Sequence, residues 1–210
     1  LVVVNTNPLY TKNEMLHQFK DSGVKGIVIL ENFCDKLEHI IDETEIESVV
    51  VCRLGDLQSP TKGFLINAGA KYVRKMVPAY NLPAAVYFSK TIKSPPLSAD
   101  YPGSGSSNDV ALILYTGGTT GFAKGAMLSH NNLIANMMQL RARCLLVIED
   151  RKENILAPLP LYHSYAFLLH CLAMPLAGNH NILVTNPRDI AGLIKLWKGQ
   201  PISGFVGINT

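Results

Sequence analysis

The sequence lacks a long apolar run, a strong charge of either sign and any close pair of cysteines. No window approaches the roughly 18 consecutive apolar residues of a membrane-spanning helix, so we expect no spanning role. The net charge is only +3 and charged residues make up 17%, so nucleic-acid binding has no global electrostatic support and we expect none. The 4 cysteines have no C-x-x-C spacing, which favours reduced, mostly buried thiols over a zinc site or a disulfide framework.

Three catalytic or nucleotide-binding motifs are also missing. There is no G-x-S-x-G, which argues against a hydrolase with a nucleophile elbow. There is no G-x-G-x-x-G, and Lys124 is followed by Gly125 rather than by Ser or Thr, so neither a dinucleotide fingerprint nor a Walker A loop is present. The histidines outside position 163 share no ligand spacing, so we expect no metal site among them and interpret these residues as structural or exposed: His17, His39, His130, His170 and His180.

What the sequence does contain is a regular alternation of apolar strands and amphipathic helices. Hydrophobic residues make up 48% of the 210 residues, enough for one large domain or two small lobes. The pattern predicts an α/β fold of two lobes with mainly parallel sheets covered by helices. In the first half we expect strands at 1–5, 26–30, 48–52 and 85–92, and helices at 12–22, 33–44 and 62–77.

A segment rich in Pro, Gly and Ser at 94–108 predicts a linker between the lobes. The predicted domains are therefore 1–93 and 109–210. In the second lobe Ser129 is a suitable N-cap for a helix at 130–141 that turns Leu133, Ile134, Met137 and Met138 inward. Further strands are expected at 109–115, 155–157, 181–185 and 203–206, and further helices at 164–176 and 189–198. The ends of the sequence resemble cuts within a longer protein.

The segment 62–77 has a basic face opposite an apolar one. Lys71, Arg74 and Lys75 lie on the polar side of the expected helix. Such a helix could rest on an anionic membrane surface. The alternative, which we favour from the sequence, is an ordinary surface helix packed on the first lobe.

The most informative stretch is Tyr-Thr-Gly-Gly-Thr-Thr-Gly-Phe-Ala-Lys-Gly at 115–125. Its four glycines allow backbone N–H groups to converge on an anion through positive φ angles. Thr116, Thr119 and Thr120 add hydroxyl donors, and Lys124 adds a positive charge. A strand precedes this segment and a helix is expected a few residues after it. The pattern predicts a polyphosphate-binding loop.

This loop resembles the phosphate-binding signature of the AMP-forming adenylating enzymes, which include acyl-CoA synthetases, luciferases and peptide-synthetase adenylation domains. Within that family the resemblance is strongest to bacterial long-chain fatty-acid–CoA ligases. It covers essentially the whole chain and is carried, beside the loop, by Ala-Lys-Gly-Ala-Met-Leu at 123–128, Pro-Leu-Pro-Leu-Tyr-His at 158–163, Thr-Asn-Pro-Arg-Asp-Ile at 185–190 and Val-Asn-Thr-Asn-Pro-Leu-Tyr at 4–10.

The resemblance implies a fragment of the large N-terminal domain of such an enzyme and a two-step reaction. A fatty acid attacks ATP to give acyl-AMP and pyrophosphate, and coenzyme A then displaces AMP. It implies that Mg²⁺ bridges the phosphates and that these residues bind them: Thr116, Gly117, Gly118, Thr119, Thr120, Gly121 and Lys124. Of these, Lys124, Thr119 and Thr120 would act in catalysis by stabilising the departing pyrophosphate. The family's later motifs, including Tyr-Gly-x-Thr-Glu and the catalytic lysine of the C-terminal domain, are missing, so the chain alone is expected to be inactive.

Two residues are expected at the acyl site from the same resemblance. His163 corresponds to a position between the acyl pocket and the path of the thiol, and Phe167 to an aromatic gate of the fatty-acid tunnel. The alternatives are a strand-end histidine with a satisfied hydrogen bond and an aromatic residue of a core helix.

Other functions stay open on the sequence alone. The acid could be an aryl, medium-chain or amino acid, or the chain could be a nucleotide-binding module without catalysis. The cysteine pattern favours a cytoplasmic protein. Peripheral contact at the inner face of the membrane through 62–77 and a homodimer are additional expectations.

Overall fold

The computed structural model describes residues 1–94, 105–117, 123–144 and 147–208. The chain divides into two compact units. Unit 1 comprises Leu1–Asn5, Gly105–Thr116 and Ala126–Thr210, and unit 2 comprises Thr6–Ser104 and Gly117–Gly125. Most of the predicted linker at 94–108 lies outside the described residues.

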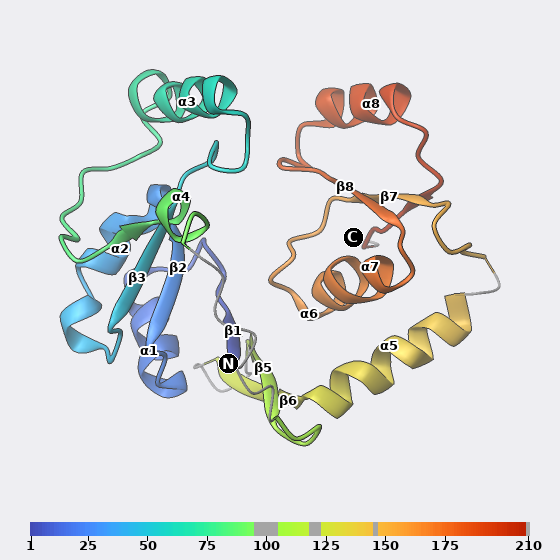
Figure 1. Ribbon diagram of the computed structural model, residues 1–210, viewed down its shortest axis with the longest axis horizontal. Helices are drawn as coiled ribbons and strands as arrows, with labels where there is room; N and C mark the ends of the chain where they lie inside the picture. The colour runs from blue at the N-terminus through green and yellow to red at the C-terminus, as the bar shows by residue number, and fades with distance from the viewer. Residues whose placement is uncertain (95–104, 118–122, 145–146, 209–210) are drawn as a thin grey trace. The chain divides into compact units, whose positions relative to one another are not determined.

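Unit 2 is built on a parallel sheet of three strands in the order β2-β3-β4. Strands β2 (Gly26–Leu30) and β3 (Ser48–Cys52) have the bounds that the sequence predicts and run side by side (Figure 1). Strand β4 (Val86–Tyr87) is much shorter than the strand expected at 85–92, because the chain turns at once into the short helix α4 (Phe88–Thr91).

Helix α1 (Lys12–Ser22) of unit 2 is closed at both ends by its own sequence. Thr11 and Glu14 form a capping box, and Gly23 ends the helix in the left-handed region at φ 59°. The buried face of α1 packs on the sheet and on α2 (Cys34–Glu38), which lies between two 3₁₀ turns, η1 (Glu31–Phe33) and η2 (Ile41–Glu43), instead of forming one helix over 33–44. The resulting core contains Met15, Phe19, Ile29, Cys34, Leu37, Ile40, Val49 and Val51.

The helix expected at 62–77 differs from the prediction in shape and in exposure. It consists of α3 (Pro60–Ala68) followed by a π-helical stretch η3 (Gly69–Val73). A π-helical turn is wider than an α-turn, so it rotates the side chains that follow it around the helix axis. Val73, on the apolar face of the expected helix, is therefore 80% exposed, whereas Ala70 is buried. Leu65 is also 64% exposed, but it lies in α3 before the π-helical stretch, so that stretch does not account for its exposure.

The first sheet, which belongs to unit 1 except for Lys124 and Gly125, has the strand order β1-β5-β6. Strand β1 (Val3–Asn5) pairs in parallel with β5 (Val110–Thr116), with Val3 opposite Leu112. The strand expected at 1–5 therefore lies in a different sheet from the strands at 26–30 and 48–52 that follow it in the sequence, since apolar alternation identifies a strand but not its neighbour. Strand β6 (Lys124–Ser129) was not predicted, because its Gly, Ala and Lys residues have low β propensity.

The second sheet of unit 1 is parallel, with the order β8-β7-β9. It comprises β7 (Asn154–Ala157), β8 (His180–Leu183) and β9 (Gly204–Phe205). The helix expected at 164–176 begins as α6 (Ser164–Ala166), continues as the π-helical stretch η4 (Phe167–Ala173) and ends as α7 (Met174–Leu176). Helix α8 (Ile190–Gly199) agrees with the predicted helix at 189–198 to within a residue at each end.

Helix α5 (His130–Cys144) begins where the sequence predicts. The Ser129 hydroxyl accepts the Asn132 N–H at 3.2 Å, which confirms the N-cap. The predicted inward face is only partly correct, because Ile134 and Met138 are 50% and 58% exposed. With these corrections, the two-unit α/β fold with mainly parallel sheets is confirmed.

Candidate functional site

The two arms of the Gly/Thr segment lie on neighbouring strands of one sheet. Thr116 is the last residue of β5, and Lys124 is the first residue of β6. Strand β5 is anchored through buried Ala111, Leu112 and Leu114, whereas Thr116, Gly117 and Lys124 are exposed. The side chains at both ends of the segment are thus open to a ligand while the strand behind them is fixed in the core.

Four of the expected phosphate-binding residues, Gly118, Thr119, Thr120 and Gly121, lie outside the described residues. Gly117 is described, and an added Cβ there would meet nothing within 4 Å. Its φ is not positive, because the positive-φ glycines of the described ranges are Gly23 and Gly178. At Gly117 neither backbone conformation nor crowding in this structure requires glycine.

His17, which the sequence indicated to be structural or exposed, contacts the segment. The Nε2 atom of His17, on α1, lies 3.1 Å from the carbonyl oxygen of Ala123, and the ring is partly buried. Ala123 directly precedes Lys124. Sequence reasoning missed this contact because the two residues are 106 positions apart.

The start of β5 is tied to the start of α5. The His130 N–H donates to the Asp109 carbonyl at 3.1 Å, and the Asn131 side chain donates to the Asn108 side chain at 3.0 Å. Asp109 in turn accepts the Ser106 N–H at 2.8 Å. These bonds fix β5 at the end opposite Thr116.

The two expected acyl-site residues lie on consecutive turns of unit 1. His163 precedes α6, and its carbonyl accepts the Phe167 N–H at 2.8 Å. The His163 ring is exposed and lies 4.7 Å from the ring of Tyr162, while Phe167 is half-buried at the start of η4. π-Helical turns occur often at functional sites, so the geometry is compatible with a role for this segment.

The histidine of η4, His170, is buried in a defined tautomer. Asn181 donates through Nδ2 to the His170 carbonyl at 2.8 Å, so its Oδ1 atom, 2.7 Å from Nδ1 of His170, must accept from the ring. The other ring nitrogen, Nε2, is buried with no partner among the described residues. This agrees with the structural role expected for His170, at the cost of one unsatisfied acceptor.

A cavity of about 20 Å³ lies in unit 1 between α5 and the η4–α7 segment. Its walls include Met137, Leu140, Cys144 and Met174, and the Arg141–Asp150 ion pair contributes polar groups. This volume holds about one water molecule. Neither His163 nor Phe167 lines it, so it is not evidence for the expected acyl tunnel.

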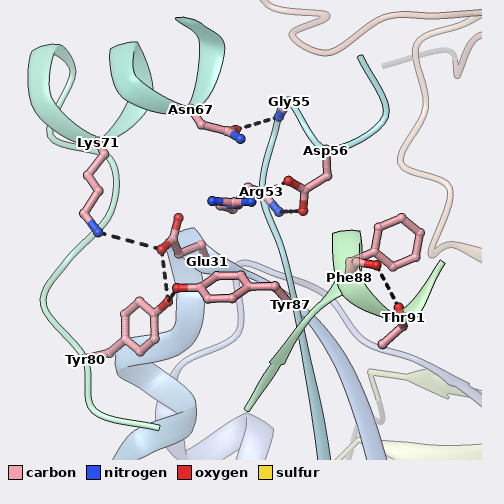
Figure 2. A network of polar contacts seen from close by, with 10 residues as sticks. All are labelled: Glu31, Arg53, Gly55, Asp56, Asn67, Lys71, Tyr80, Tyr87, Phe88 and Thr91. Atoms are coloured by element: carbon pink, nitrogen blue, oxygen red, sulfur yellow. Dashed lines mark hydrogen bonds and ion pairs between the residues drawn. The ribbon is translucent and has the colours of Figure 1, made fainter. Parts of the chain in front are cut away.

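Unit 2 carries a polar network at the carboxyl ends of its parallel strands. Glu31 follows β2, Arg53 follows β3 and Tyr87 ends β4 (Figure 2). The Tyr80 hydroxyl donates to Glu31 at 3.0 Å, and the Lys71 ammonium lies 3.9 Å from the same carboxylate oxygen. Burial, followed by the hydrogen bonds to Tyr87 and Glu31, raises the pKa of Tyr80 well above its ordinary value.

The cations of this network are matched by carboxylates. The Arg53 guanidinium lies 4.8 Å from the Tyr87 ring, and its Nε donates to Asp56 at 3.2 Å. Asn67 accepts the Gly55 N–H at 2.8 Å, which ties α3 to the chain after β3. Because Arg53 and Lys71 balance Asp56 and Glu31, we interpret the network as a structural anchor for the 53–87 segment.

The four cysteines are free, and three of them, Cys34, Cys52 and Cys171, are poorly suited to redox chemistry. Burial, with a smaller effect of Glu31, raises the pKa of Cys34 to about 12. Burial also raises the pKa of Cys52 and of Cys171. Their thiols therefore stay protonated near neutral pH, as expected for reduced structural cysteines.

Two searches for further features gave negative results within the described ranges. No group of three or more His, Cys, Asp or Glu side chains there could hold a metal ion. No helix within 1–94, 105–117, 123–144 and 147–208 has the length and apolar character needed to cross a bilayer.

Comparison with known sequences gives matches along the whole chain. Residues 1–210 match the family described as AMP-binding enzyme. The chain is 42% identical over 210 residues to a long-chain-fatty-acid–CoA ligase of Escherichia coli O157:H7, covering 100% of this chain and 37% of that protein. It is 41% identical over 212 residues to a ligase of the same name from Haemophilus influenzae, covering 100% and 38%.

Comparison with solved structures gives proteins of similar fold. A long-chain-fatty-acid-CoA ligase from Archaeoglobus fulgidus superposes with a TM-score of 0.58 at 27% identity, covering 93% of this chain and 33% of that one. ATP-bound MatB from Rhodopseudomonas palustris superposes with a TM-score of 0.63 at 22% identity, covering 98% and 34%. At that identity the second likeness shows the fold alone. The chain spans about 37% of the length of its Escherichia coli relative.

Proposed function

The chain belongs to the AMP-binding enzyme family, and from that premise we propose that it is part of a long-chain fatty-acid–CoA ligase. The full-length protein would activate a fatty acid with ATP to acyl-AMP and pyrophosphate, and then form acyl-CoA. The observation that carries the proposal is the Gly/Thr segment between exposed Thr116 and Lys124 on adjacent strands, in a chain 42% identical to such a ligase. The predicted lobes 1–93 and 109–210 stay part of this proposal.

The phosphate-binding role is assigned to Thr116, Gly117, Lys124 and the residues between them. A carboxylate is a poor electrophile, so the reaction makes it a mixed anhydride and expels pyrophosphate. Lys124 and the hydroxyls of Thr119 and Thr120 would stabilise the charge that gathers on the leaving group. The exposure of Thr116 and Lys124 supports this role, since neither is buried in the core.

On the acyl side we assign His163 and Phe167 to the substrate site. His163 is exposed at the N-terminus of α6, which suits a residue at a junction open to a second substrate. Phe167 is half-buried and begins the π-helical stretch η4, which suits a side chain that moves between packed and open positions. Coenzyme A is the proposed acceptor of the acyl group.

Mg²⁺ fits this site best as a complex with ATP. The described residues form no metal-ligating cluster, and the segment from Thr116 to Lys124 contains no carboxylate. Mg²⁺ keeps several waters and binds substrate phosphates readily, so phosphate oxygens would be its main ligands. When bound, it would neutralise part of the phosphate charge.

The segment 62–77 supports a second contact, with an anionic membrane surface. Phe64 and Tyr72 are 71% and 73% exposed, and Arg74 and Lys75 are also exposed beside them. A helix simply packed on unit 2 would bury more of this apolar surface. We therefore propose peripheral contact of a cytoplasmic protein at the inner face of the membrane, and keep the homodimer as a proposal to be tested by light scattering.

ATP–pyrophosphate exchange in the full-length protein tests the proposed function. We expect exchange that depends on a long-chain fatty acid and is weak with aryl, medium-chain and amino acids. Lys124→Ala should lower the rate about 10²-fold, because it removes a charge from the leaving group. Lys195→Ala on α8 is the matched control and should leave the rate unchanged. Exchange without any acid preference, or full activity of Lys124→Ala, would contradict the proposal.

A further inference from the structure

We propose that His17 is a positioning residue, which fixes the backbone of Lys124 through a hydrogen bond to the preceding carbonyl. The proposal rests on the proposed function, since it concerns the same phosphate-binding lysine. The observation is the 3.1 Å distance from Nε2 of His17 to the carbonyl oxygen of Ala123. Both residues belong to unit 2.

The donor is held by a rigid element. Helix α1 is closed by the Thr11–Glu14 capping box and by Gly23, and it buries Met15 and Phe19, two residues on either side of His17, in the core of unit 2. Gln18, the next residue, is also buried. The half-buried ring of His17 is therefore carried by a helix that cannot shift without disturbing that core.

The bond acts on Lys124 through the planarity of the peptide. The Ala123 carbonyl oxygen, the Lys124 nitrogen and the Lys124 Cα lie in one plane. A donor that fixes the oxygen therefore fixes the orientation of this peptide plane, and with it the position of the Lys124 Cα. This is the point from which the lysine side chain starts.

In the described part of the chain, the lysine is positioned through its backbone and not through its side chain. Lys124 is exposed, and within the described ranges its ammonium makes no ion pair or hydrogen bond with another residue. An unrestrained lysine side chain samples many rotamers, so the direction of its Cα–Cβ bond decides which of them reach a bound phosphate. Holding the 123–124 peptide restricts that direction before ATP arrives.

The chemistry of the His17–Ala123 hydrogen bond determines which substitutions of His17 test it. A carbonyl oxygen only accepts, so Nε2 of His17 must carry the hydrogen. The primary amide of glutamine offers an N–H donor at similar reach, whereas leucine keeps apolar volume and offers no donor. His17→Gln and His17→Leu thus separate the hydrogen bond from the packing of the side chain.

The experiment measures ATP–pyrophosphate exchange in the full-length protein. His17→Leu should lower kcat/KM for ATP about three- to tenfold, which is the range expected for losing one hydrogen bond. The KM for the fatty acid should not change, and His17→Gln should restore at least half of the loss. A general loss of folded structure would instead change both substrates alike and would appear as a lower Tm.

His39→Leu is the matched control. Its ring bonds a backbone carbonyl of its own segment, that of Asp35, at 2.6 Å. Within the described residues, no hydrogen bond joins His39 to the two ends of the Gly/Thr segment, 115–117 and 123–125. The same substitution there should leave kcat/KM for ATP within twofold of the parent. An equal loss in both variants would mean that histidine removal acts through stability, and would overturn the proposal.

A double-mutant cycle with Lys124→Ala tests whether His17 affects ATP–pyrophosphate exchange through Lys124. If His17 acts through Lys124, His17→Leu has no further effect on kcat/KM for ATP once the lysine side chain is gone. Independent, additive losses, or no loss from His17→Leu alone, overturn the inference while leaving the ligase proposal intact. A Lys124→Ala variant as active as the parent overturns both.

Discussion

At the scale of single residues, Glu31 shows how unit 2 accommodates a buried charge. Its side chain is only 8% exposed, and it accepts the Tyr80 hydroxyl at 3.0 Å while Lys71 lies at 3.9 Å (Figure 2). The Tyr80 bond is the shorter and better formed of the two. A buried carboxylate that loses a donor keeps its desolvation cost, so Tyr80 should contribute more to stability than its size suggests.

We therefore predict that Tyr80→Phe lowers the free energy of unfolding by about 1–3 kcal/mol. The measurement is urea denaturation followed by circular dichroism. Tyr72→Phe is the control, because this substitution removes the same hydroxyl group from a tyrosine that is 73% exposed to solvent. It should change the free energy of unfolding by no more than about 0.5 kcal/mol. Equal effects of the two variants would show that Glu31 does not depend on the Tyr80 bond.

The sequence was most informative where a single residue type or short pattern determines the local structure. Ser129 as an N-cap and the apolar strands at 26–30 and 48–52 are found as predicted. It could not reveal the His17–Ala123 bond, which joins residues that only the fold brings together. The roles of the loop residues, Lys124 among them, stay predictions.

At the scale of elements, η3 shows why helical periodicity gave the wrong inner face beyond Gly69. The prediction assumed a constant α-helical turn over 62–77, but the chain changes to a π-helical turn at Gly69. Side chains beyond that point lie on a different face from the one that the periodicity gives. The exposed apolar residues of this segment, together with its cations, are the features that support membrane contact.

Flotation with anionic vesicles tests that contact. We predict that replacing Arg74 and Lys75 together by Ser weakens binding of the full-length protein at least about tenfold, because each cation near an anionic surface contributes about 1 kcal/mol. Lys90 and Lys93, exposed cations of the same unit, provide the paired control and should matter little. The effect should vanish on neutral vesicles and shrink at high salt. Charge-independent flotation would rule out this surface.

At the scale of the whole molecule, apolar alternation predicted the α/β class but not the pairing of the strands. Strand β1 lies beside β5, more than 100 residues later in the chain, with Val4 opposite Ile113. Every parallel strand presents the same near-continuous apolar pattern, so the pattern does not identify partners. The match over residues 1–210 to a family of known fold supplies what periodicity lacks.

The share of the relatives that the chain spans leads to the last prediction. It covers 37% of the Escherichia coli ligase, and the proposed reaction needs carboxylate, α-phosphate and leaving group held together in one geometry. Small misplacements of reacting groups cost about 10²-fold in rate, and missing groups cost more. Residues 1–210 alone should therefore show acid-dependent ATP–pyrophosphate exchange at least 10³-fold below that of the full-length protein, measured at equal concentration. Circular dichroism of the shorter chain must show α/β structure for the comparison to hold. Exchange near the full-length rate would mean that the parts needed for adenylation already lie within these residues.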